Sequence, residues 1–94
     1  MENLAGSIGA IRQAVARFCR SKSPLDAGSL SELIRENWSA IQRYDDLARE
    51  KSERLSGTPL TDACNDWVEA ANGVDADMLG HAQRIAEVID QGAR

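Results

Sequence analysis

The sequence has few aromatic residues, cysteines, prolines and histidines. Only 4% of its 94 residues are aromatic, and it has two cysteines, two prolines and one histidine. The cysteines form no CxxC pair, so they provide neither a zinc motif nor a disulfide framework, and we expect both to be reduced. Asp77 and His81 have the spacing of two metal ligands on one helix, but two ligands do not complete a site. With no nucleophile or phosphate-loop motif either, we expect no enzyme, no metal and no cofactor.

Long apolar runs are also missing. No stretch of 18 apolar residues occurs, so we expect no membrane span. No apolar segment of the secretory type follows Met1. The first 23 residues contain arginine and serine and almost no acid, as transit peptides do, but an ordinary amphipathic helix explains the same pattern. We predict a cytoplasmic protein, with signal-peptide-independent secretion as the alternative.

The composition that is present is globular. Hydrophobic residues make up 43% of the chain and charged residues 28%. Ninety-four residues suit one domain, so we predict a single helical domain over residues 1–94, with one core and no deep ligand cavity. The net charge of −4 and the pI of about 4.9 disfavour direct nucleic-acid binding.

Helical periodicity is the strongest signal. Apolar residues recur at alternating steps of three and four, the spacing of a coiled coil, and no stretch alternates like a strand. In the first segment these residues are Leu4, Ile8, Ile11, Val15 and Phe18. We therefore predict an all-α protein, a three-helix bundle built on a long antiparallel helical hairpin. The predicted helices span about residues 3–21, 29–56 and 59–91, with a linker at 22–28.

Capping residues set these predicted boundaries. Ser29 and Glu32 have the spacing of a capping box at the start of the second helix. Gly57 is placed to end that helix and Pro59 to begin the next, and so short a connection makes the two helices antiparallel. Asn72-Gly73 interrupts the third helix, but the apolar spacing continues in phase, so we expect one continuous helix. If the chain turns there, the protein has four helices.

The unequal helix lengths predict an open apolar surface. At 1.5 Å per residue the first helix is about 28 Å long, against about 40–50 Å for the other two. It cannot cover the turn end of the hairpin, and an open apolar groove in a small protein usually meets a partner or a second copy. The predicted apolar contacts are Leu55, Leu60, Trp67 and Trp38.

Charge is divided between the ends of the chain. Residues 1–20 carry three arginines against one acid, whereas residues 57–94 carry two arginines against seven acids. We expect the basic segment to steer an acidic partner and the acidic segment a basic one. The predicted charged contacts are Arg12, Arg17, Arg20, Asp62, Asp66 and Glu69.

These features predict a small non-enzymatic protein–protein interaction module. It would act by helix packing, either by self-association as a homodimer or by docking a partner protein. One alternative uses the three acids Asp62, Asp66 and Glu69, which form one stripe at helical spacing. Such a stripe is typical of acidic inhibitors or immunity-type proteins that mimic nucleic acid and occupy a basic groove.

A second alternative is a family resemblance. Two helices joined by a tight turn, and the texture of the segment from Trp67 to Gly92, resemble the WXG100 (ESAT-6-like) proteins of specialised secretion. The resemblance implies a secreted helical hairpin. The family's Trp-x-Gly turn is missing, because Trp38 is followed by Ser-Ala and Trp67 by Val-Glu. The family's Tyr-x-x-x-Asp/Glu signal is also missing, because Ala48 stands four residues after Tyr44.

Overall fold

The computed structural model describes residues 4–51, 59–73 and 77–92, and it contains α-helices but no strand in these ranges. The all-α prediction is confirmed. The helices are α1 (Leu4–Ser21), α2 (Pro24–Glu36), α3 (Trp38–Lys51), α4 (Leu60–Asn72) and α5 (Met78–Gly92).

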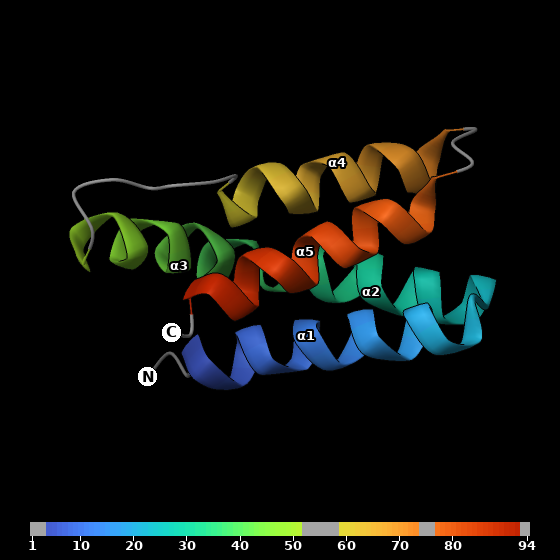
Figure 1. Cartoon of the computed structure of the whole chain (residues 1–94), viewed down its shortest axis with the longest axis horizontal. Helices are drawn as coiled ribbons and strands as arrows, with labels where there is room; N and C mark the ends of the chain where they lie inside the picture. The colour runs from blue at the N-terminus through green and yellow to red at the C-terminus, as the bar shows by residue number, and fades with distance from the viewer. Residues whose placement is uncertain (1–3, 52–58, 74–76, 93–94) are drawn as a thin grey trace.

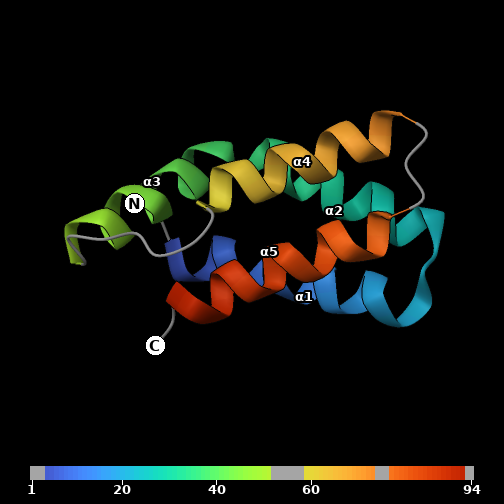
Figure 2. The ribbon, with the colours of Figure 1, turned by 45° about the horizontal axis from the view of Figure 1, so that its top comes forward.

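Successive helices reverse direction except α2 and α3, which run the same way (Figure 1). Helices α1 and α4 point one way, whereas α2, α3 and α5 point the other way (Figure 2). Helices α2 and α3 follow one another along one corner, so the described helices form four corners. Around the bundle, α1 and α4 each pack against the α2–α3 corner and against α5. The expected three-helix bundle on a long hairpin is therefore not what this chain forms.

Helix α2 begins earlier than predicted. Ser23 has an extended backbone, its Oγ accepts the Leu25 N–H at 3.1 Å, and Pro24 occupies the first helical position. Ser23 therefore caps the Leu25 N–H, and the helix begins at Pro24. Ser29 lies inside this helix rather than at its N-cap. Most of the expected linker at 22–28 is consequently helical.

Asn37 divides the predicted second helix into α2 and α3. Its backbone leaves the helical region (φ −112°, ψ 24°), and its side-chain amide Nδ2 donates to the Leu33 carbonyl at 2.8 Å. The Asn37 N–H also donates to that carbonyl, at 3.0 Å. Asparagine side chains compete in this way with the regular helical bonds. The prediction of one helix over 29–56 is therefore wrong.

The predicted third helix also divides. Helix α4 ends at Asn72, Gly73 has an extended backbone (φ −118°, ψ −165°), and α5 begins at Met78 and returns antiparallel to α4 (Figure 1). The chain therefore reverses after α4, as the alternative predicted, but the described residues form five helices rather than four. Apolar spacing could not reveal the reversal, because two amphipathic helices that face one core keep the same pattern across a turn.

The core is aliphatic and has one tryptophan at its centre. Trp67 is fully buried, its ring meets Phe18 edge-on at 5.1 Å between centroids, and its Nε1 donates to Ser31 Oγ at 3.0 Å. The buried core residues are Ile8, Ile11, Ala14, Val15, Phe18, Leu30, Ile34, Ile41, Leu60, Ala63, Cys64, Trp67, Ala82, Ile85 and Ile89. Four of the five apolar residues predicted for the first helix are among them.

Candidate functional site

Two of the four predicted apolar contacts lie in the core. Leu60 and Trp67 are both 0% exposed, so neither offers surface to a partner in this fold. The reason is the turn after α4: helix α5 folds back and covers the face that a continuous helix would have left open. Leu55, and the Gly57 turn beside it, lie outside the described residues. Of the four, this leaves Trp38 with surface to offer, and it is half-buried at the start of α3.

Trp38 lines a hollow between α2 and α4. The hollow has a volume of about 310 Å³, and its other walls come from Ile34 and Arg35 of α2 and from Asn65 and Val68 of α4. The break at Asn37 positions the tryptophan, because α3 restarts there and its first residue lies against the end of α2. Part of Trp38 thus stays accessible beside the side chains of Ile34 and Val68.

The acidic stripe of α4 borders this hollow. Asp62, Asp66 and Glu69 are all exposed, and they share helix α4 with the two hollow-lining residues Asn65 and Val68. The amide Nδ2 of Asn65 donates to Glu69 Oε1 at 3.4 Å, which joins the rim of the hollow to the stripe. The surface around Trp38 therefore combines a hollow lined by Ile34, Val68, Asn65 and the exposed Arg35 with three negative charges along α4.

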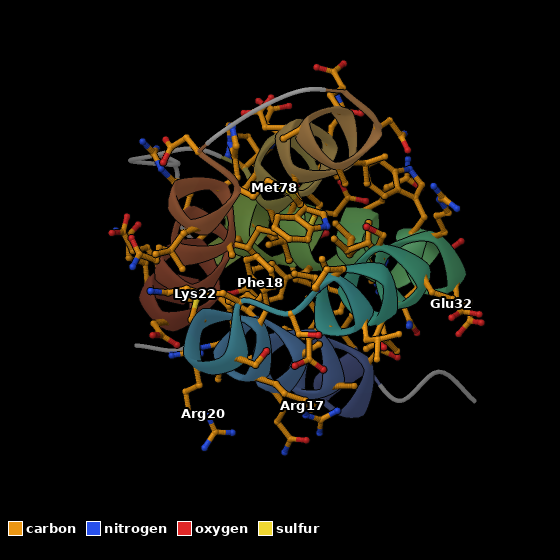
Figure 3. The ribbon with its side chains drawn as sticks, turned by 90° about the vertical axis from the view of Figure 1, so that its right-hand side faces the viewer. Arg17, Phe18, Arg20, Lys22, Glu32 and Met78 are labelled. Atoms are coloured by element: carbon orange, nitrogen blue, oxygen red, sulfur yellow. The ribbon has the colours of Figure 1, made fainter. Side chains whose placement is uncertain are left out.

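The three predicted arginines do not form one group. Arg12 donates to Asp90 of α5 through Nε at 3.0 Å and through Nη2 at 3.2 Å, and this hydrogen-bonded partner raises the Arg12 pKa further. Arg17 and Arg20 are exposed near the end of α1, where they project away from the bundle (Figure 3). Arg12 is engaged within the chain, whereas the other two contribute to the charge at one end of the molecule.

A larger hollow opens at that same end. Its volume is about 670 Å³, it is open to solvent, and residues of α1, α2, α4 and α5 line it. Small residues explain it: Ala27, Gly28 and Ala71 line the hollow, and a Cβ placed on Gly28 would meet no atom within 4 Å. Its charged lining residues are Lys22 and Arg35. No sequence motif marks this hollow, because it arises where small side chains from separate helices meet.

Asp45 is a buried carboxylate that belongs to no motif in the sequence. It is 5% exposed, and its two oxygens accept the N–H groups of Leu60 at 2.7 Å and Thr61 at 2.8 Å. Pro59, the N-cap residue of α4, provides no side-chain cap, so α3 caps α4 from a distance. The signal in the sequence is the position of Asp45 four residues after Ile41, on the buried face of its helix. Its task is structural.

The two cysteines show no sign of a catalytic role in the described structure. Burial raises the pKa of the Cys64 thiol to about 12, so it stays protonated at neutral pH and is a poor nucleophile. Cys19 and Cys64 are both free. Among the described residues, no three histidine, cysteine or acidic side chains come together as metal ligands. In the same part of the chain, no helix is both long and apolar enough to cross a bilayer.

Comparisons with protein-family models, with curated proteins and with solved structures find no match to this chain.

Proposed function

We propose that this chain is a non-enzymatic helical module that docks a protein partner on the surface around Trp38. The observation that carries the proposal is the half-buried indole in a hollow between α2 and α4. Tryptophan is enriched among residues that dominate binding energy, and such residues lie in hollows surrounded by polar rims. The other large predicted anchors are in the core or outside the described residues, so Trp38 is the residue on which docking depends.

The charges beside the hollow specify the partner. Asp62, Asp66 and Glu69 give α4 an exposed negative face. A complementary partner places an apolar side chain against Trp38 and lysines or arginines beside the acids. An amphipathic helix with a basic rim meets both requirements, and helix-in-groove docking is a common mode of recognition.

A second copy of the chain is a poorer occupant. Among the described residues, Leu25 is the one large hydrophobic side chain that is well exposed, at 82%. The apolar faces of all described helices otherwise turn toward the bundle core. Of the four apolar residues predicted to contact a partner or a second copy, Leu60 and Trp67 are buried and Leu55 lies outside the described residues. The proposal is therefore a heterologous partner.

A pair of synthetic peptides tests this proposal. One is an amphipathic helix with a leucine face and lysine flanks, and the other replaces every lysine with glutamate. We expect the basic peptide to bind with a sub-millimolar Kd and the acidic peptide to bind at least tenfold more weakly. Trp38→Ala should weaken binding of the basic peptide about thirtyfold, the usual cost of a central anchor. Fluorescence anisotropy of labelled peptide measures each Kd.

Matched variants separate the acidic stripe from net charge. Asp66→Asn with Glu69→Gln should weaken binding about threefold to tenfold at low salt, because exposed charge pairs contribute modestly and are screened. Glu50→Gln with Glu87→Gln changes the net charge equally on α3 and α5 and should have little effect. Equal losses in both pairs, or unchanged binding in Trp38→Ala, would overturn the proposal.

The nucleic-acid mimic keeps one supporting observation, which is the exposure of all three acids of the stripe. A mimic depends on charge rather than on an apolar anchor, so its binding falls steeply with salt and does not need the indole. Binding that disappears at high salt and is unchanged in Trp38→Ala favours the mimic over the docking module.

A further inference from the structure

The hollow at the end of the bundle has the properties of a ligand site, separate from the surface around Trp38. Figure 3 looks into this end, and Phe18 and Met78 lie over the middle of the bundle with Lys22 beside them. Phe18 is 6% exposed and forms the floor, while Met78 and Leu79 of α5 are half-buried along one wall. The volume of about 670 Å³ falls within the range of small-molecule pockets.

The charged lining is entirely basic. Lys22 and Arg35 are both exposed, and no acid is among the described residues that line the hollow. Arg17 and Arg20 are at the same end but project away from the bundle (Figure 3), and the acid Asp26 also lies there, outside the lining. Two cations and no anion in the described lining favour an anionic ligand inside the hollow.

The two lining cations lie at opposite ends of the hollow. Lys22 precedes the first turn of α2, whereas Arg35 is in its last turn. The helical rise between Pro24 and Arg35 is about 16 Å, so one small carboxylate does not fit both cations. A linear apolar molecule with an acidic group at each end matches this spacing once the two long side chains reach toward it.

Lys22 provides an independent observation. Its φ of 54° places it in the left-handed region, where it ends α1 by donating its N–H to the Phe18 carbonyl at 2.6 Å. Glycine is the usual residue at such a helix end, and a lysine there is strained. The turn is held by Ser21, whose Oγ donates to Asp26 and accepts the Ser23 N–H at 3.1 Å. Strained non-glycine residues concentrate at binding sites, where the side chain has a use.

We propose that this hollow binds a linear aliphatic dicarboxylate. The apolar chain lies against Phe18, Met78 and Leu79, one carboxylate meets Lys22 and the other meets Arg35. This site goes beyond the proposed protein docking. Arg35 also lines the hollow at Trp38, whereas Lys22 belongs to the end hollow alone, so Lys22 is the residue that distinguishes the two proposals.

Titration with three ten-carbon probes tests the site. Decanedioate, decanoate and decanol share the chain and differ in their acidic groups. We expect decanedioate to bind with a Kd on the order of 0.1–1 mM, as ordinary ligand efficiency gives for a molecule of this size. Decanoate should bind about threefold to fivefold more weakly, and decanol more weakly again, since each exposed ion pair contributes modestly. Chemical shifts of the Met78 methyl group report the binding.

Two substitutions of Lys22 separate its charge from its backbone strain. Lys22→Gln keeps the strain and should weaken decanedioate about threefold to fivefold. Lys22→Gly should weaken it equally while raising the Tm by roughly 2–5 °C, because glycine adopts this conformation freely. Arg20→Gln, which removes a charge at the same end but outside the hollow, should change the affinity little.

Three outcomes would overturn the proposal: no saturable binding of decanedioate, equal affinity for decanol, or unchanged affinity in both Lys22 variants. None of them bears on peptide docking at Trp38, whose test uses a different probe and a different residue.

Discussion

Asp45 shows how one side chain can determine a helix junction. Its carboxylate accepts two N–H groups at the start of α4 from within α3, so a single buried charge fixes the position of one helix against the other. Hydrogen bonds to charged groups are stronger than neutral ones, and the positive end of the α4 dipole favours the carboxylate.

Asp45→Ala should therefore lower the free energy of unfolding by about 2 kcal/mol, the range for losing a cap and charge-assisted bonds. Asp46→Ala is the control, because Asp46 is the adjacent exposed residue, and it should change stability by less than about 0.5 kcal/mol. Urea denaturation followed by far-UV circular dichroism measures both. Similar losses in the two variants would show that the cap contributes nothing specific.

The boundaries of the helices depend on local competition between capping signals. Either Ser23 or Ser29 could be the N-cap of the second helix, because Ser23 precedes a proline and Ser29 stands three residues before Glu32. The structure uses Ser23 with Pro24 and leaves Ser29 exposed inside α2. A proline fixed at the first helical position makes the earlier start the better one.

Alanine substitutions distinguish the two starts. Ser23→Ala removes the N-cap and should destabilise the protein by about 1 kcal/mol. Ser29→Ala should be neutral or slightly stabilising, because alanine has the higher propensity inside a helix. The difference in midpoint of thermal unfolding is the readout, at about 4–8 °C per kcal/mol for a domain of this size. A larger loss in Ser29→Ala would mean that the helix starts at the capping box after all.

The elements that sequence could predict are those whose signals are local. The apolar spacing of α1 places Ile8, Ile11 and Val15 in the core, and the all-α class follows from the same periodicity. The break at Asn37 has no apolar signal in the sequence, because it depends on the Asn37 side-chain amide sharing the Leu33 carbonyl with the Asn37 N–H. The reversal after Asn72 does not follow from the apolar spacing, since periodicity carries no information about chain direction.

The surface of the whole molecule was the least predictable part. Helix lengths predict that Leu60 and Trp67 are exposed. Both are buried in the structure, because α5 folds back and packs against α4. Trp38 kept its accessibility because the break at Asn37 places it at a helix start beside a hollow. The end hollow arises from small residues on four corners, which no linear pattern connects.

At the scale of the whole molecule, the two tryptophans have opposite environments. Trp67 is the centre of the core, with its indole N–H bonded to Ser31, whereas Trp38 is the proposed anchor for a basic helix. The most direct test is two-dimensional ¹H–¹⁵N NMR of the two indole groups during titration with the lysine-flanked amphipathic peptide. The account predicts that the Trp38 indole signal shifts and saturates while the Trp67 signal stays in place. A stationary Trp38 signal, or a Trp67 signal that moves as far, would contradict it.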